Sequence, residues 1–273
     1  MGKQPMKTYR RIYTIPDIHG RIDLLDLALE LIDKDGHDKN QDIIVFLGDY
    51  IDRGPNSFEV VDLINKLVES GEALAIRGNH ENFAVDYYCG KGGKEIWLMN
   101  GGYQTLSSYR DKTGHEKMSD EHIKFLGALL HYLEFQGFFF SHAPVPREKA
   151  RVGSKGFREP FGEAGEPYNK WELTWHYFGP EGEKKGALMD KHEGPLSQHE
   201  SGKHLIGLCG HIHRGPNVEE VRIFPNYRML DVGCGCFPSG PLAIHEAIEN
   251  RTFYAKPSDL RKKKTSDPTT DKK

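Results

Sequence analysis

Five short polar clusters in this chain carry side chains that bind metal ions or move protons. The clusters are Asp17-Ile18-His19, Gly48-Asp49-Tyr50-Ile51-Asp52-Arg53, Arg77-Gly78-Asn79-His80-Glu81, Ser141-His142 and Gly210-His211-Ile212-His213. Their carboxylate, imidazole and amide groups suit Mn, Fe or Zn better than Ca. They are too many for one tetrahedral ion and suit two ions, about 3.5–4 Å apart, that share one carboxylate. The candidate ligands are Asp17, His19, Asp49, Asn79, His142, His211 and His213.

Each cluster taken alone also has an ordinary structural interpretation. An aspartate that precedes a helix, such as Asp17, is more often an N-cap than a ligand. Asp49 and Asp52 could serve as turn or cap residues, and His142 could be a hydrogen-bonded histidine of the core. Capping alone does not explain why five such clusters recur in one frame, so together they favour a functional site.

Every cluster directly follows a predicted strand. These strands are predicted at residues 11–15, 43–47, 73–76, 138–141 and 205–209, with further strands at 222–224, 229–232 and 242–245. Helical periodicity is present at residues 24–31, 60–68, 95–109 and 120–133. The alternation is typical of a layered α/β domain, in which ligands bind at the carboxyl ends of the strands. We therefore expect the clusters to converge on one site.

The length of 273 residues suits a single domain, which we place at residues 1–256. Residues 144–203 are rich in Gly and Pro and lack periodicity, so we expect an irregular insertion over the active face. Residues 257–273 are rich in Lys, Thr, Asp and Pro, which predicts a disordered tail.

Composition excludes several classes of protein. No apolar run approaches the roughly 20 residues that span a bilayer, so we expect no membrane partner. Four cysteines are too few for a disulfide scaffold in so long a chain, which favours a reducing, cytoplasmic setting. The net charge of −3 becomes −6 over residues 1–256, because the tail carries +3. Such an acidic body argues against dedicated nucleic-acid binding.

The strings Asp17-x-His19-Gly20, Gly48-Asp49-x-x-Asp52-Arg53-Gly54, Arg77-Gly78-Asn79-His80-Glu81, His142 and Gly210-His211 resemble those of the calcineurin-like metallophosphoesterases. Within that family they are most similar to the phosphoprotein phosphatase branch, which includes bacterial serine/threonine phosphatases and diadenosine tetraphosphatases. Residues 97–109 also resemble the bacterial members. The resemblance covers residues 10–145 and 205–247 and implies an α/β fold. That fold is a four-layer αββα sandwich of two mixed β-sheets flanked by helices.

The resemblance also implies a dinuclear centre of two divalent metal ions, with Mn as the leading candidate and Fe or Zn as alternatives. Asp17 and His19 would hold the first ion and Asp49 would bridge. The second ion would be held by Asn79, His142 and His211. The two ions would activate a bridging hydroxide that attacks phosphorus in line.

Further roles follow from the same resemblance. His80 would protonate the leaving oxygen, and Asp52 would orient His80. Arg53, a planar and permanently charged donor, would bind equatorial phosphate oxygens, and Asn79 would contribute to substrate binding.

Two features depart from the phosphatase branch. That branch usually has Gly-His-Thr-Pro where this chain has Gly210-His211-Ile212-His213, so His213 could join the first metal as in phosphodiesterases and nucleases. A second phosphate-binding arginine is expected after His142, yet residues 173–177 contain none. Arg158 is the candidate for that role.

We predict metal-assisted hydrolysis of phosphomonoesters, with phosphoserine or phosphothreonine in proteins as the leading substrate. A dinucleoside polyphosphate or another nucleotide anhydride is the first alternative, because Trp171 and Trp175 could stack a nucleobase. A phosphodiesterase is the second. A catalytically silent phosphate-binding module is disfavoured, because every matched position is chemically competent.

Overall fold

The computed structural model describes residues 7–143, 206–211, 220–224 and 227–260 of the chain. The predicted insertion at 144–203 and the two residues Arg158 and His213 lie outside the described residues. The boundary placed at residue 257 lies inside them. Residues 257–260 form one helical turn, and Leu260 packs against the core.

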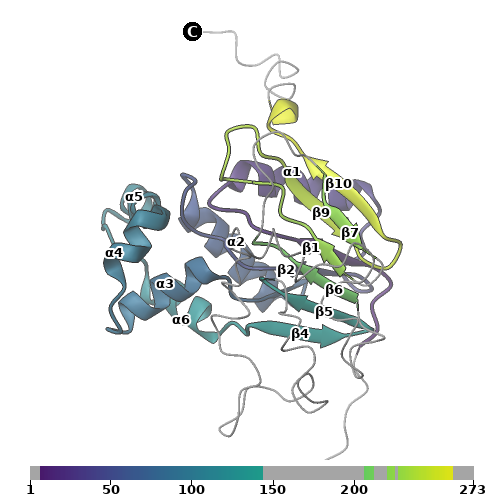
Figure 1. Cartoon of the computed structure of the whole chain (residues 1–273), viewed down its shortest axis with the longest axis horizontal. Helices are drawn as coiled ribbons and strands as arrows, with labels where there is room; N and C mark the ends of the chain where they lie inside the picture. The colour runs from purple at the N-terminus through teal and green to yellow at the C-terminus, as the bar shows by residue number, and fades with distance from the viewer. Residues whose placement is uncertain (1–6, 144–205, 212–219, 225–226, 261–273) are drawn as a thin grey trace, which may run out of the picture.

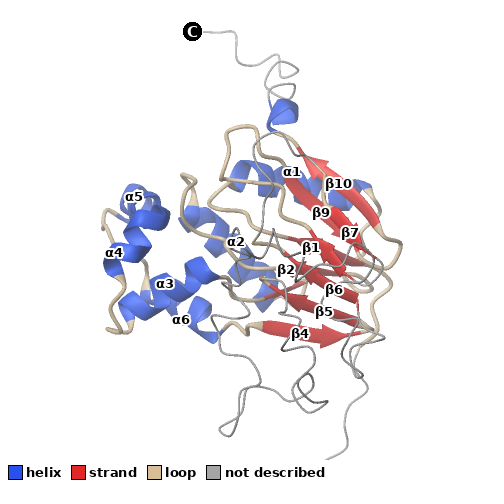
Figure 2. Ribbon diagram, in the orientation of Figure 1, coloured by secondary structure: helices blue, strands red, loops and turns tan. Residues whose placement is uncertain are grey.

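Two five-stranded mixed sheets form the centre of the molecule (Figures 1 and 2). The first sheet has the order β10-β9-β1-β2-β3 and consists of β1 (Ile12–Ile15), β2 (Ile43–Phe46), β3 (Ala73–Ala75), β9 (Leu242–Glu246) and β10 (Arg251–Ala255). The second has the order β4-β5-β6-β8-β7 and consists of β4 (Tyr132–Phe135), β5 (Phe138–Ser141), β6 (Ile206–Cys209), β7 (Arg222–Phe224) and β8 (Tyr227–Met229). β1, β2 and β3 are parallel, as are β5, β6 and β8. This arrangement confirms the predicted pair of mixed sheets.

Helices flank the sheets in two groups. The helices are α1 (Ile22–Lys34), α2 (Ser57–Glu69), α3 (Asn79–Tyr88), α4 (Lys94–Trp97), the π-helix η1 (Leu98–Gly102), α5 (Tyr103–Thr113) and α6 (Asp120–Ala128). α1 packs on β9 and β10, and α2 packs on β3. α3 to α6 gather in a lobe at one side of the sheets (Figure 2). None of the helices in the described part of the chain is long and apolar enough to cross a membrane.

The side-chain alternation of the strands divides the buried core in two. Tyr13 and Ile15 point to the helical side, where they join one cluster with the apolar faces of α1 and α2. Ile12 points the other way and joins a second cluster with Phe140 and Leu208 of the second sheet. The first sheet is therefore buried on both faces, which explains why its parallel strands read as short continuous apolar runs.

Two predicted helices differ from those observed. The helix expected at 95–109 is interrupted by η1, in which Gly101 has φ 109°. The turn brings Gly101 so close to Arg53 that a Cβ on the glycine would lie 2.7 Å from the backbone nitrogen of Arg53. The helix expected at 120–133 ends at Ala128. Tyr132 and Leu133 belong instead to β4, which pairs with β5. Pairing with a neighbouring strand overrode the local periodicity.

Candidate dinuclear metal centre

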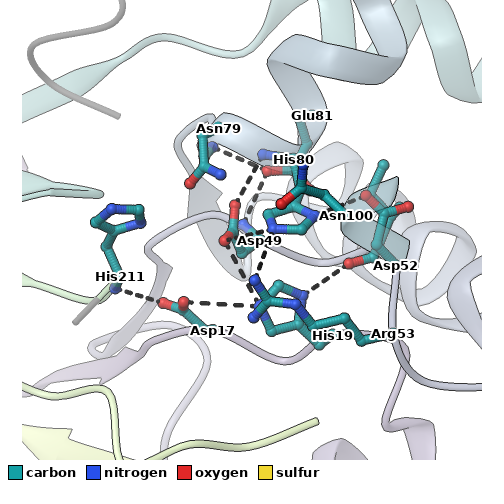
Figure 3. A network of polar contacts seen from close by, with 12 residues as sticks. Asp17, His19, Asp49, Asp52, Arg53, Asn79, His80, Glu81, Asn100 and His211 are labelled. Carbon is teal, nitrogen blue, oxygen red and sulfur yellow. Dashed lines mark hydrogen bonds and ion pairs between the residues drawn. The ribbon is translucent and has the colours of Figure 1, made fainter. Parts of the chain in front are cut away.

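The predicted polar clusters meet at one edge of the two sheets. Asp17 follows β1, Asp49 follows β2, and Asn79 begins α3 just beyond β3. His142 follows β5 and His211 follows β6 in the second sheet. Because the strands within each group are parallel, their carboxyl ends lie together. Figure 3 shows the Asp49 carboxylate among the converging side chains, with Asp17 between His19 and His211.

Two groups of potential ligand atoms share Asp49. In the first group, Asp49 Oδ2 lies 3.6 Å from His19 Nε2 and 3.8 Å from His80 Nε2. The second group consists of Asp49, His142 and His211, with Asp49 Oδ1 3.4 Å from His142 Nε2. The two carboxylate oxygens therefore face two separate groups, which is the arrangement that a bridging ligand requires.

Asp17 and Asn79 complete the two groups. Asp17 Oδ2 lies 3.9 Å from His19 Nε2, and its Oδ1 accepts a hydrogen bond of 2.8 Å from the backbone nitrogen of His211. Asn79 Oδ1 lies 2.9 Å from His142 Nε2. Asp49 and five other candidate ligands predicted from the sequence are thus gathered at this edge of the sheets.

Hydrogen bonds to backbone carbonyls fix the orientation of two histidine rings. His19 Nδ1 lies 2.9 Å from the Ile51 oxygen, and His142 Nδ1 lies 2.9 Å from the Leu47 oxygen. A carbonyl can only accept, so each Nδ1 carries a proton and each Nε2 points towards Asp49. Metal-binding histidines in proteins are commonly held in this way.

The buried carboxylates of the site have strongly displaced pKa values. Burial and the nearby carboxylate of Asp231 raise the pKa of Asp17 well above its usual value. Burial alone would do the same to Asp49, but the charges of His142 and His80 hold the pKa of Asp49 well below its usual value. Carboxylates this deeply buried require compensating positive charge.

The histidines divide into neutral and charged rings. Burial and the charge of Arg53 lower the pKa of His19 well below its usual value, and burial and His142 lower the pKa of His211 to about 3. Both rings are neutral at pH 7, which is the form that binds metal ions. Burial would also lower the pKa of His142, but the carboxylates of Asp49 and Asp17 raise it to about 10. The proton on His142 balances these carboxylates, as a bound cation would.

The loops that carry the site hold an unusual backbone conformation. Five of the seven described non-glycine residues with positive φ belong to it, namely His19, Asp49, Asp52, Arg53 and His211. L-amino acids adopt this left-handed region at a cost of roughly 1–2 kcal/mol each, and such strain is concentrated at functional sites. These strained conformations lower the stability of the fold and orient the side chains of the site.

His80 and Arg53 lie beside the shared aspartate. His80 Nδ1 is 2.6 Å from Asp52 Oδ2, and both residues are fully buried. The Arg53 guanidinium lies 2.7 Å from His19 Nε2 and 3.1 Å from His80 Nε2, and it also contacts Cys236 Sγ. The charged guanidinium of Arg53 thus lies beside the first ligand group, next to His80, which Asp52 orients.

The sequence profile of the calcineurin-like phosphoesterases matches residues 10–215. The chain belongs to this family. It is 35% identical to serine/threonine-protein phosphatase 1 of Salmonella typhimurium over 96 residues, which are 35% of this chain and 41% of that protein. It is 29% identical to the asymmetrical bis(5'-nucleosyl)-tetraphosphatase PrpE of Oceanobacillus iheyensis over 161 residues, 54% of this chain and 61% of the other. The chain thus spans about two fifths to three fifths of the length of these relatives.

Solved structures show the same fold. A protein serine/threonine phosphatase of Saccharomyces cerevisiae superposes with a TM-score of 0.55, covering 88% of this chain and 73% of the other at 16% identity. The two ion-binding groups that the family implies are matched by the donors of this chain. A shared carboxylate, backbone-held imidazoles and a buried Asp17 with a raised pKa all fit divalent cations.

Several residues of the candidate site had no role assigned from sequence. Glu81 accepts hydrogen bonds from the backbone nitrogens of Asp49, Tyr50 and Gly78, at 2.8–2.9 Å. Its position three residues after the helix N-cap Gly78 was the available signal, because glutamate is favoured there. Cys236 also belongs to this region, because its thiol contacts Arg53. Local sequence carried no signal for that contact, since the two residues lie far apart in the chain.

Proposed function

We propose that the protein is a metal-dependent phosphomonoesterase that acts on phosphoserine and phosphothreonine in proteins. The observation that carries this proposal is the position of Asp49 between two ligand groups, with Arg53 and the His80–Asp52 pair beside it. Two cation sites, a phosphate-binding guanidinium and a proton donor are the groups that hydrolysis of a phosphate ester requires.

The proposed ligands of the first ion are Asp17, His19 and Asp49, and those of the second are Asp49, Asn79, His142 and His211. His80 Nε2 is also close to Asp49 Oδ2, but its ring is engaged through Nδ1 with Asp52, so we assign His80 to proton transfer. Manganese is the first metal to test. When bound, two such cations lower the pKa of a water molecule and offset the charge of the phosphate.

Arg53 and His80 act on the ester itself in this proposal. The guanidinium of Arg53 reaches both His19 and His80, so its donors can hold equatorial phosphate oxygens near either ring. His80 presents Nε2 to the same region and can deliver a proton to the departing alkoxide. Asn79 would contribute a further polar contact to the substrate. Arg158 and His213 stay predictions from the sequence.

The names of the relatives support the proposed chemistry and define its main alternative. Serine/threonine-protein phosphatases 1 and 2 of enterobacteria match about a third of the chain. The match to PrpE of Oceanobacillus iheyensis is longer, at 54% of the chain, so hydrolysis of a dinucleoside tetraphosphate is the second candidate.

All four cysteines are free, which supports the reducing, cytoplasmic setting predicted from composition.

The decisive experiment is hydrolysis of p-nitrophenyl phosphate by protein that has been stripped of metal and then supplied with Mn²⁺. We expect turnover that depends on Mn²⁺. On phenyl phosphate, whose more basic leaving group needs a proton, turnover should also fall about 100-fold or more in His80→Ala. No turnover with Mn²⁺, or turnover of phenyl phosphate unaffected by His80→Ala, would refute the proposed enzyme.

A second experiment compares a phosphoserine peptide with diadenosine tetraphosphate at equal concentration. A higher kcat/KM for the peptide is expected, and the reverse order would transfer the assignment to the nucleotide. Hydrolysis of bis(p-nitrophenyl) phosphate alone would instead indicate a phosphodiesterase.

A further inference from the structure

Asp52 is held by more hydrogen bonds than its role beside His80 requires. Trp97 Nε1 donates to its carboxylate, at 3.0 Å from Oδ1 and 3.1 Å from Oδ2. The hydroxyl of Thr105 lies 2.6 Å from Oδ1. All three side chains are fully buried. The carboxylate therefore reaches His80 with one oxygen while two donors from elsewhere hold it in place.

The backbone of Asp52 fixes the direction of these bonds. The Asp52 nitrogen donates to Thr105 Oγ1 at 2.9 Å and to Ser57 Oγ at 3.1 Å. Because Thr105 accepts the backbone proton, its own hydroxyl proton is available to Asp52 Oδ1. The indole of Trp97 can only donate. Asp52 thus acts as an acceptor towards both, and its remaining acceptor site at Oδ2 faces His80 Nδ1.

The geometry sets the tautomer and direction of the His80 ring. With Nδ1–H donating to Asp52 Oδ2 at 2.6 Å, Nε2 is the atom left towards Asp49, at 3.8 Å. A carboxylate free to turn about its χ2 angle would hold the ring less firmly, because terminal torsions of this kind are broad. The two donors remove that freedom.

Both donors come from the lobe that follows the metal-binding segments in sequence. Trp97 ends α4 and Thr105 lies in the first turn of α5, on either side of η1. Gly102 of η1 packs against the indole of Trp97, since a Cβ at Gly102 would lie 2.9 Å from that ring. π-Helical turns are frequent at functional sites. Here the interruption allows two side chains eight positions apart to meet one carboxylate.

We propose that Trp97 and Thr105 are positioning residues for proton transfer, because they lock the Asp52 carboxylate that orients His80. This role rests on the proposed phosphomonoesterase activity. It predicts that losing a donor harms esters with a strongly basic leaving group, which need a proton, more than esters whose leaving group departs without one.

The test uses Thr105→Val, which keeps the shape of the side chain and removes its hydroxyl, with Thr105→Ser as the matched variant that retains it. kcat/KM is measured on phenyl phosphate and on p-nitrophenyl phosphate, whose leaving group is the weaker base. We expect Thr105→Val to lose about tenfold on phenyl phosphate and less than about threefold on p-nitrophenyl phosphate, and Thr105→Ser to be near the unaltered protein on both. Trp97→Phe should show the same selectivity as Thr105→Val.

Tyr109→Phe is the control for loss of a buried hydroxyl in the same helix, because its hydroxyl bonds His122 and not Asp52. It should lower activity on the two esters equally or not at all. A measurement without turnover accompanies the kinetics. The short hydrogen bond between His80 and Asp52 should give a low-field proton resonance that is kept in Thr105→Ser and shifted or broadened in Thr105→Val.

Equal losses on the two esters in Thr105→Val, or an unchanged low-field resonance, would refute the positioning role while leaving the phosphomonoesterase activity in place. The same selectivity in Tyr109→Phe would also refute it. Absence of turnover by the unaltered protein would refute the proposed function and this role with it.

Discussion

Asp49 is the residue on which the proposed centre depends, because each of its oxygens faces a different ligand group. Its environment is built around a negative charge. The backbone nitrogen of His80 donates to Asp49 Oδ1 at 3.1 Å, and His142 lies against the same oxygen. Glu81 accepts a hydrogen bond from the backbone nitrogen of Asp49. A neutral amide of similar shape would fill the space without bridging two cations.

Asp49→Asn is therefore expected to reduce bound manganese from two ions per chain to one or fewer. Metal content after dialysis, measured by atomic emission, gives the stoichiometry. Asp62→Asn is the control, since Asp62 lies on α2 outside both ligand groups, where it pairs with Lys66 and His122. Two ions per chain in Asp49→Asn would contradict the bridging assignment.

Arg53 is expected to act on the phosphate and not on the metals. Arg53→Ala should raise the inhibition constant of inorganic phosphate about 10- to 100-fold, because a hydrogen bond to a charged group contributes roughly 1.5–3 kcal/mol. Arg53→Lys should recover only part of this affinity, since an ammonium cannot bind two oxygens as a planar fork. Competition kinetics against p-nitrophenyl phosphate measure both variants. An unchanged inhibition constant in Arg53→Ala would exclude the contact.

At the scale of elements, the turn between β3 and α3 shows how tightly the site is packed. Gly78 is the N-cap of α3, and its φ of −91° is open to any residue. A Cβ at this position would nevertheless lie 2.1 Å from Asp49 Oδ1. Glycine is required there for space and not for backbone conformation.

Gly78→Ala should consequently displace Asp49 and weaken binding of Mn²⁺ about 10- to 100-fold, the usual effect of disturbing the groups around a ligand. Isothermal titration calorimetry measures the affinity. Gly127→Ala, near the end of α6 with nothing within 4 Å of the added atom, supplies the control and should leave the affinity unchanged. Equal affinities in the two variants would show that the close packing of Gly78 against Asp49 does not control Mn²⁺ binding.

At the scale of the whole molecule, Asp35 joins the beginning of the described chain to its last strand. It follows α1 and accepts two hydrogen bonds from Arg251 of β10, at 3.0 and 2.9 Å, and one of 2.8 Å from Tyr13 of β1. Its hydrogen bonds to Arg251, helped by Tyr13, lower the pKa of Asp35 below its usual value. A carboxyl with a lowered pKa in the folded state stabilises that state only while it is ionised.

Asp35→Asn should lower the free energy of unfolding by about 1–2 kcal/mol at pH 7, as expected for hydrogen bonds to a charged group at a partly exposed site. The contribution is present above the unfolded pKa of about 3.9 and disappears as the pH falls through the lower folded value. Urea titrations at pH 7 and in strong acid measure the difference. A gap between variant and unaltered protein that persists in acid would show that the charge is not its cause.

Much of the first sheet and of its site could be predicted from the sequence, for reasons visible in single residues. Short apolar runs such as Ile43 to Phe46 are buried on both faces, so hydrophobicity alone indicated the strands and their ends located the polar clusters. β4 and β10 were missed, because most of their residues are only half buried and each is an edge strand that pairs with a single neighbour, β5 and β9 respectively. Trp97 and Thr105 were missed for a different reason, since the helix interruption η1 is needed to bring them to Asp52.

The distribution of ligands between the two sheets has a consequence for biosynthesis. A nascent chain that has been translated as far as residue 143 carries every proposed ligand except His211. It still lacks β6, which pairs with β5, and β9, which pairs with β1. Translation must therefore pass His211 and β9 before the second ion can find its full set of proposed donors on a completed pair of sheets. A chain cut short before β6 would therefore carry the donors proposed for the first ion but not the full set proposed for the second.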